Sequence, residues 1–221
     1  MTGLPWLRRL SALASLDDGN RRRLYEHVCG ANDAVSRDDA AMALGLPRST
    51  ASFHLDRLVR DGLLSVEFRK LGGKVGPGSG RPAKLYAPVV EEVGASVPER
   101  HYDLAGEVMA SAIQALMTQG GSPREALLET AYARGREAGS VEPHFEDVLA
   151  SYGYRPEADD DGGYSLVNCP FHRLAESHTN VVCALNGAFL SGAAAACGIA
   201  EDRIADDNRE GHCCARILPA D

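Results

Sequence analysis

The chain has 221 residues, of which 44% are hydrophobic, and a formal net charge of -8. Its apolar runs fall short of the ~20 residues that a membrane-spanning helix needs, and no apolar core follows Arg8 and Arg9 as it would in a signal peptide. These properties argue against a membrane protein and predict a cytoplasmic globular protein of one large domain or two small ones.

Charge is distributed unevenly along the chain. Residues 1–90 hold 14 Lys and Arg against 9 Asp and Glu, a balance of +5, whereas residues 91–221 hold 9 against 22, a balance of -13. Affinity for DNA comes largely from Lys and Arg that displace counterions from phosphates. The basic first half therefore favours binding to nucleic acid, and a chance fluctuation in surface charge is the alternative.

Short helices follow one another from residue 20. Leu24 and Val28 lie at helical spacing, and Cys29 after them is expected to be a core residue. Ser36 is a predicted N-cap, with an acidic residue, Asp39, three positions further on. Gly45 then supplies a turn, so that one short helix is predicted before it and another after it.

The helix after this turn has two distinct faces. Pro47 is tolerated in its first turn, where a missing N–H has no partner to lose, and Gly62 is a C-cap after Asp61. A helix–turn–helix places such a second helix in the major groove, with its leading side chains on base edges and phosphates. The residues expected to contact DNA from this helix are Arg48, Ser49, Thr50, Ser52, His54 and Arg57.

A hairpin is predicted next. Leu63–Arg69 alternates as a strand does, residues 71–84 are rich in glycine, and Leu85–Ala87 is the returning strand. Such a basic hairpin is a wing that suits phosphate or minor-groove contact, and an unrelated loop after a helical hairpin is the alternative. The wing residues expected to contact DNA are Lys74, Arg81 and Lys84.

These segments resemble a known family. Leu16–Val28 resembles the first helix of the ArsR-like winged-helix regulators, and Gly80–Tyr86 resembles the wing of one branch of that family. The resemblance covers residues 13–90. It implies a winged helix-turn-helix DNA-binding domain at residues 1–90, and a double-stranded DNA operator as the partner of the chain.

The rest of the chain is predicted to be a linker, residues 91–100, and a C-terminal α+β domain, residues 101–221, so that the whole chain is α+β. A helix from Tyr102 carries an apolar stripe that is either core or part of a homodimer interface. Two further helices, residues 124–137 and 141–152, precede two strands within residues 154–169. The turn between these strands, Asp159–Gly163, lacks the ligand spacing of an EF-hand and is interpreted as a solvated tip.

Five of the six cysteines lie in the last 53 residues. Cys169 follows a strand, and its Cys-Pro step also occurs in some iron–sulfur ligand runs. A short helix over residues 173–177 precedes a helix from Asn180, and Cys183 lies in the first turn of that second helix, where the helix dipole favours a thiolate. In a cytoplasmic protein, such thiols serve metals or redox chemistry more often than disulfides.

Geometry separates the thiols. Cys197 would lie about 21 Å from Cys183 along a continuous helix, too far for a shared ligand site. Cys213 and Cys214 lie on a predicted strand, residues 211–217, and point to opposite faces, so that at most one faces a given site. The coherent set is Cys169, Cys183 and one of the final pair.

This set resembles the cysteine pattern of the SufR-like branch, winged-helix repressors that sense iron–sulfur status through a bound cluster. The matching runs are residues 169–178, 181–183 and 213–217, with 13 residues between the first two cysteines, one more than in that branch, which places the chain in a neighbouring subgroup. The resemblance implies Cys169, Cys183 and Cys213 as ligands of an iron–sulfur cluster of the 4Fe-4S type, in a repressor whose operator affinity the cluster controls. The fourth ligand stays open among Cys214, His212, His172, His178 and a non-protein group.

Three alternatives remain at this point. Zinc would also accept three thiolates and a histidine, although no Cys-x-x-Cys pair is present. The cysteines could instead be buried small hydrophobic residues of a metal-free regulator. A thiol hydrolase with Cys183 as nucleophile and His178 as base lacks a recognisable oxyanion hole, so the chain is not predicted to be an enzyme.

Overall fold

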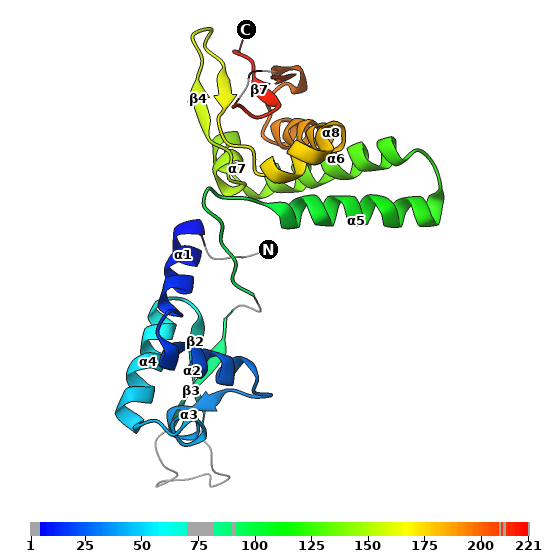
Figure 1. Cartoon of the computed structure of the whole chain (residues 1–221). Coiled ribbons are helices and arrows are strands. Elements are labelled where there is room, and N and C mark those ends of the chain that lie inside the picture. Colours follow the sequence, from blue (N-terminus) through cyan, green and yellow to red (C-terminus); the bar gives the residue numbers. More distant parts are fainter. Residues whose placement is uncertain (1–4, 70–81, 90–91, 208, 210, 221) are drawn as a thin grey trace. The chain divides into compact units, whose positions relative to one another are not determined.

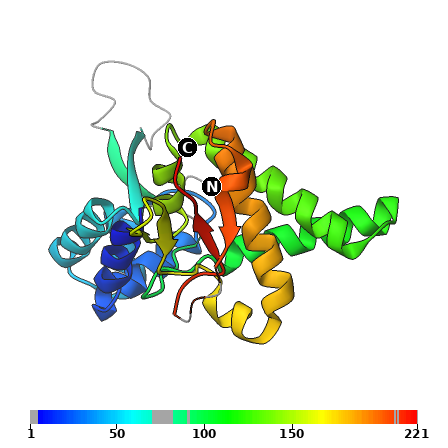
Figure 2. The same ribbon diagram turned by 90° about the horizontal axis from the view of Figure 1, so that it is seen from above.

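The computed structural model describes residues 5–69, 82–89, 92–207, 209 and 211–220. The chain divides into two compact units, Met1–Ala95 and Ser96–Asp221. Both units combine helices with an antiparallel sheet, as Figures 1 and 2 show. The prediction of an α+β fold is therefore confirmed.

The first unit contains four helices around a small sheet among its described residues. The sheet has the strand order β1-β3-β2, with both pairings antiparallel. Apolar side chains from the helices and from Tyr86 form its core. The elements are α1 (Trp6–Ser15), α2 (Gly19–Cys29), β1 (Val35–Ser36), α3 (Arg37–Leu44), α4 (Arg48–Arg60), β2 (Leu64–Arg69) and β3 (Ala83–Pro88).

Local signals account for the helix boundaries of this unit. The Asp18 carboxylate accepts hydrogen bonds from the backbone N–H groups of the first turn of α2, and the Ser36 hydroxyl accepts one from Asp39. Gly45 ends α3 in the left-handed conformation, with φ of 65°. Pro47 is the N-cap residue of α4, so the helix begins at Arg48 and not at Pro47 as the sequence predicts.

The second unit consists of an α-helical layer and a four-stranded sheet. The sheet has the order β4-β5-β7-β6 and is antiparallel throughout. In Figures 1 and 2, α5 and α6 form an extended hairpin, and α8 lies along α6. The elements are α5 (Tyr102–Gln119), α6 (Pro123–Val141), α7 (Phe145–Ser151), β4 (Pro156–Ala158), β5 (Tyr164–Leu166), α8 (His172–Ala196), the 3-10 helix η1 (Glu201–Arg203), β6 (Ile204–Asp206) and β7 (Ala215–Ile217).

Glycines allow α6 and α8 to pack backbone against backbone. A Cβ atom on Gly135 would lie 2.0 Å from the Phe189 carbonyl oxygen, and one on Gly192 would lie 2.1 Å from the Tyr132 carbonyl oxygen. Real Cβ atoms do not approach backbone oxygens so closely, so these positions require glycine. The contact fixes α8, and with it every side chain that α8 presents to the sheet.

The helix α8 differs from the prediction in two respects. The predicted short helix and the helix from Asn180 are joined, and the break between them survives as a kink at His178, with φ of -135° and ψ of 42°. Among the described residues, α8 alone is long and apolar enough to cross a membrane by length and composition, and 44% of its most apolar stretch is buried inside the structure. The prediction that the apolar runs fall short of a membrane-spanning helix is therefore wrong for α8, by length and composition.

Candidate nucleic-acid interface and candidate metal centre

The helices α3 and α4, with the Gly45 turn between them, present the polar start of α4 at the surface. Arg48, Ser49 and Arg57 are exposed, and Thr50 and Ser52 are half-buried. The apolar face of α4 is covered by the core of the unit. The arrangement leaves the leading side chains of α4 free to reach base edges and phosphates.

His54 does not share this surface, which corrects the prediction for this residue. The residue is only 8% exposed, and its Nδ1 atom lies 3.9 Å from an oxygen of Asp18. The reason is helical geometry, because His54 follows Ala51 by three residues and precedes Leu58 by four, and both are buried. His54 therefore packs between α4 and the start of α2.

Phe53 is a surface residue that the sequence analysis missed. It is 65% exposed on α4, and its ring meets that of His54 edge to face. An aromatic side chain outside the buried helix face is a recognisable signal, because the apolar stripe of α4 passes through Ala51, Leu55 and Leu58 instead. An exposed phenyl ring suits apolar contact with a thymine methyl group.

The cations of this surface are paired within the unit. Arg48 forms an ion pair with Asp38 of α3, at 2.5 Å, and Arg57 forms one with Asp61, at 3.0 Å. Both members of the Arg48 pair are exposed, and such a pair contributes little stability, whereas the Asp61 side chain is largely buried. Arg48 can therefore exchange its carboxylate for a phosphate at small cost.

Lys84 connects the wing strand β3 to α4. Its ammonium group binds the Asp56 carboxylate and lies 5.2 Å from the centre of the Tyr86 ring. Burial opposes ionisation of Asp56, but hydrogen bonds from Lys84 and Tyr86 outweigh it and lower the pKa of that carboxyl. Lys74 and Arg81, the other predicted wing contacts, lie outside the described residues.

In the second unit, four of the six cysteines come together. Cys169 lies in the turn before α8, Cys183 on α8, and Cys213 and Cys214 in the segment that leads into β7. The thiol of Cys213 lies near those of Cys169 and Cys214, and the thiol of Cys183 lies near that of Cys214. The four thiols therefore form one group. We call these four residues the thiol cluster.

The surroundings of Cys169, Cys183 and Cys213 favour neutral thiols. The hydrogen bond with Cys213, followed by burial, raises the pKa of Cys169, and burial raises that of Cys183. The hydrogen bond with Cys169 favours a Cys213 thiolate, but the bond with Cys214 and burial outweigh it and raise the pKa of Cys213 to about 12. A metal that bound here would displace protons.

Both terminal cysteines face the cluster, contrary to the prediction that at most one would. The strand β7 begins at Ala215, so the alternation of a strand does not apply to the pair. The Cys213 N–H donates to the Leu166 carbonyl at 2.7 Å, and the Cys214 carbonyl accepts from the Asp207 N–H at 3.0 Å. These bonds hold the pair between β5 and the end of β6.

The segment that carries Cys169 is anchored by polar contacts of its own. The Asn168 amide donates to the carbonyl of Glu99 at 3.2 Å and to that of Gly153, and it accepts from the Arg100 guanidinium. The backbone of His101 donates to the Pro170 carbonyl at 3.1 Å. Residues 99–101, at the end of the predicted linker and just after it, thus pack beside Cys169.

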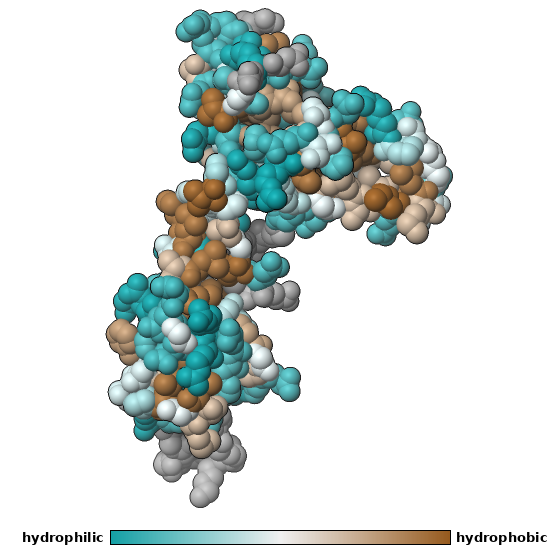
Figure 3. Space-filling model, viewed as in Figure 1, coloured by the Kyte–Doolittle hydropathy of each residue, from teal (hydrophilic) through white to brown (hydrophobic). Residues whose placement is uncertain are grey.

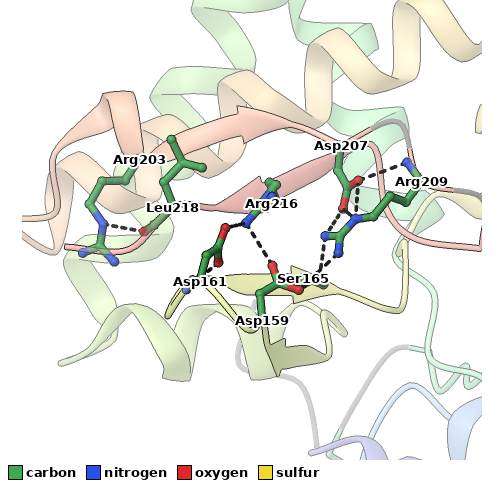
Figure 4. A network of polar contacts seen from close by, with 9 residues as sticks. Asp159, Asp161, Ser165, Arg203, Asp207, Arg209, Arg216 and Leu218 are labelled. Atoms are coloured by element: carbon green, nitrogen blue, oxygen red, sulfur yellow. Dashed lines mark hydrogen bonds and ion pairs between the residues drawn. The ribbon is translucent and has the colours of Figure 1, made fainter. Parts of the chain in front are cut away.

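A network of aspartates and arginines holds the β6–β7 segment against the β4–β5 hairpin (Figure 4). Arg209 binds Asp207 at 2.7 Å and Asp159 at 3.2 Å, and Arg216 binds Asp161 at 2.6 Å. The Asp207 side chain is almost fully buried beside Arg209. The predicted solvated tip at residues 159–163 is therefore a partner of the segment that carries Cys213 and Cys214.

The remaining candidate donors lie elsewhere. His172 is exposed and pairs with Glu176 on its own helix, at 3.3 Å, and His178 and His212 are exposed. Cys197 contacts the Gly139 carbonyl at 3.7 Å, and Cys29 is exposed rather than buried as predicted. Within the described part of the chain, no group of three or more His, Cys, Asp or Glu has the spacing to hold a single metal ion.

Comparison with known proteins bears on the first unit. A family model described as a helix-turn-helix domain matches residues 16–67, which span α2, α3, α4 and most of β2. Searches of curated proteins and of solved structures gave no match. The match, together with the hairpin of β2 and β3 that follows α4, makes the first unit a winged helix-turn-helix domain and the chain a DNA-binding transcriptional regulator.

Proposed function

We propose that this regulator is a homodimeric, cytoplasmic repressor whose affinity for its DNA operator is controlled by an iron–sulfur cluster of the 4Fe-4S type bound to Cys169, Cys183, Cys213 and Cys214. The observation that carries the proposal is the meeting of these four thiols from three separate segments. When bound, such a cluster would supply a centre sensitive to oxidation and to iron supply. The remaining protein would convert its presence or loss into a change of DNA affinity.

The chemistry of the donor set fits this group. Soft thiolate sulfurs select iron–sulfur clusters, zinc and copper(I) over harder metals. The site is half-buried, because Cys213 is buried and the other three thiols are partly exposed, so that a small inorganic group or an oxidant could reach it. A nucleophilic role for Cys183 fits less well, because burial raises its thiol pKa.

The hydrophobic core of the second unit favours a sensing role over a structural one. Structural zinc stabilises small domains that bury too little apolar surface on their own. Here a large cluster of buried apolar side chains, including Phe171, Leu185 and Phe189, already surrounds the thiols. Metal that is not needed for folding can be gained and lost without unfolding the chain.

Control of DNA binding requires only a modest coupling between the units. Each 1.4 kcal/mol of coupling free energy changes the operator affinity tenfold. A helix-turn-helix regulator with a two-fold operator depends on the spacing of its two recognition helices. Repacking of α8 and the β6–β7 segment on loss of the cluster would alter that spacing.

An apolar face of the α5–α6 hairpin supports the homodimer. A groove of about 350 Å³ lies between α5, α6 and α8, and its lining includes Met109, Ile113, Leu127 and Val181. Figure 3 shows apolar side chains gathered on the hairpin, where Ile113 is 57% and Met117 is 83% exposed. We propose the same face of a second copy as its partner. Ile113→Glu should convert dimers to monomers in sedimentation, whereas Val141→Glu, at an exposed apolar position outside the groove, should not; equal masses for both variants would contradict this interface.

The proposed function is tested by preparing the chain without oxygen. We expect brown protein with about equal iron and acid-labile sulfide, and altered affinity for duplex DNA selected from a random pool when the cluster is removed. Zinc without sulfide would identify a zinc regulator instead. Colourless protein that takes up neither metal after reconstitution would leave a metal-free DNA-binding protein.

A further inference from the structure

We infer that Asn186 and Tyr154 form a hydrogen-bond relay that aims the Asn186 amide N–H groups at the sulfurs of Cys213 and Cys214, and that this relay strengthens metal binding by the thiol cluster and raises the reduction potential of the bound cluster. The inference rests on the proposed function. It adds to the four ligands two positioning residues that no sequence pattern assigns.

Asn186 is a polar side chain at the centre of the hydrophobic core. It is 0% exposed, lies one turn after Cys183 on α8, and is flanked by the buried Leu185 and Phe189. An amide in such a place costs free energy unless its donors and acceptor are used. Its contacts therefore show what it does.

Those contacts connect the thiols with a buried phenol. The Asn186 Nδ2 atom lies 3.3 Å from the Cys213 sulfur and 3.6 Å from the Cys214 sulfur. The Asn186 Oδ1 atom accepts a hydrogen bond from the Tyr154 hydroxyl at 2.6 Å. Tyr154 is itself only 4% exposed. Both ends of the amide are thus satisfied inside the core.

Metal binding would fix the direction of this relay. A thiolate that ligates a metal has no proton, so it can only accept hydrogen bonds. The NH2 end of Asn186 must then face the sulfurs, and its oxygen must face Tyr154, as observed. The Tyr154 hydroxyl holds the amide in this orientation, as second-shell partners do for other metal ligands.

Hydrogen bonds to the sulfurs have two measurable consequences. They favour the anionic thiolate over the neutral thiol, so they strengthen metal binding. They also favour the more negatively charged, reduced state of a bound cluster, so they raise its reduction potential. A residue that only filled space in the core would affect stability without shifting the potential.

The relay is tested with Asn186→Leu, which removes the amide at similar volume, and with Tyr154→Phe, which removes only the hydroxyl. Tyr86→Phe is the matched control, because it removes a hydroxyl that donates to Asp56 at 2.8 Å in the other unit. The first measurement is the chelator concentration that removes half of the cluster iron after anaerobic reconstitution. The second is the reduction potential of the cluster after anaerobic reconstitution, and melting curves establish that each variant is folded.

We expect the cluster of Asn186→Leu to lose its iron at a chelator concentration about ten- to a hundredfold lower, and its potential to become more negative. Tyr154→Phe should move both values in the same direction by less, and Tyr86→Phe should leave both unchanged. If Asn186→Leu does not fold, Tyr154→Phe decides the question on the same two readouts.

Wild-type iron retention and potential in both folded variants would overturn the relay while leaving the proposed function intact. Wild-type chain that takes up no iron and sulfide after reconstitution would overturn the relay together with the proposed function.

Discussion

The two units present their functional side chains in different ways. In the helix-turn-helix unit, Arg48, Ser49 and Arg57 project from a single helix, α4. In the second unit, Cys169, Cys183 and Cys213 come from three segments, each held by different contacts. A surface on one helix depends on that helix and its caps, whereas a site of converging segments depends on the packing of the whole unit. Disturbances far from the thiols should therefore reach them, and those far from α4 should not reach the DNA-binding surface.

The largest expected effect comes from the α6–α8 contact. Gly192→Ala would place a Cβ atom 2.1 Å from the Tyr132 carbonyl oxygen, and we expect the free energy of unfolding to fall by about 3 kcal/mol. Gly187→Ala on the same helix is the control, because its Cβ would meet nothing within 4 Å, and it should stabilise the protein by about 0.5–1 kcal/mol. Denaturant unfolding measures both. Equal stabilities would show that the second unit does not depend on this contact.

A second substitution addresses the DNA-binding surface alone. Arg48→Ala removes a cation whose present partner is Asp38, at 2.5 Å, and should weaken DNA binding in a salt-dependent way, with the salt slope reduced by about one. Arg136→Ala, an exposed arginine of α6, should leave both affinity and slope unchanged. Fluorescence anisotropy on a selected duplex at several salt concentrations measures this. If both arginines had the same effect, the DNA-binding surface would not be confined to α4 and the wing.

Helix capping gives a smaller effect in the first unit. The Ser36 hydroxyl accepts the Asp39 N–H at 3.1 Å at the start of α3, so Ser36→Ala should cost about 1 kcal/mol of unfolding free energy. Ser11→Ala, at an exposed position inside α1, should change stability by less than about 0.5 kcal/mol. Thermal melts compare the two. A larger loss from Ser11 would contradict the dominance of capping here.

The smallest expected effect is the acid response of the network in Figure 4. A hydrogen bond with Arg209 lowers the pKa of Asp207 against burial, and hydrogen bonds from Ser165 and then Arg209 lower that of Asp159. The network therefore stabilises the fold fully above the unfolded-state pKa, about 3.9, and loses this contribution as the pH falls through the folded values.

Arg209→Met should accordingly have a lower melting temperature than the wild type at neutral pH. In strong acid the two melting temperatures should become equal. Arg136→Met is a control, because Arg136 is an exposed arginine on α6 of the same unit. If the melting temperature of Arg209→Met fell further below that of the wild type as the pH was lowered, the depressed pKa values of Asp207 and Asp159 would be contradicted.

The range of the contacts also decides what the sequence can predict. Asp39 after Ser36, Gly45 and the alternation of residues 63–69 lie within or beside the elements that they set, and the order α3, α4, β2 follows from them, whereas α1 and β1 are not predicted. His54 is wrongly predicted to face DNA, because the prediction rests on its polar side chain and not on its position on the buried face of α4.

In the second unit, the helices were predictable and the site only in part. The set of cysteines followed from spacing and resemblance, but both members of the final pair face the site because β7 begins only at Ala215. The pairing of β6 with β7, the role of Arg209 and the burial of Asn186 depend on contacts between distant segments. No local pattern of residues encodes such contacts.

The central claim is that four thiols from three segments bind one iron–sulfur cluster. The most direct test is the iron and sulfide content per chain, after anaerobic reconstitution, of Cys→Ser variants at each of the six cysteines. The account predicts loss of both in the variants of Cys169, Cys183, Cys213 and Cys214, and wild-type content in those of Cys29 and Cys197, which lie outside the thiol cluster. Full cluster content in the Cys169 and Cys183 variants, or equal loss in all six, would contradict it.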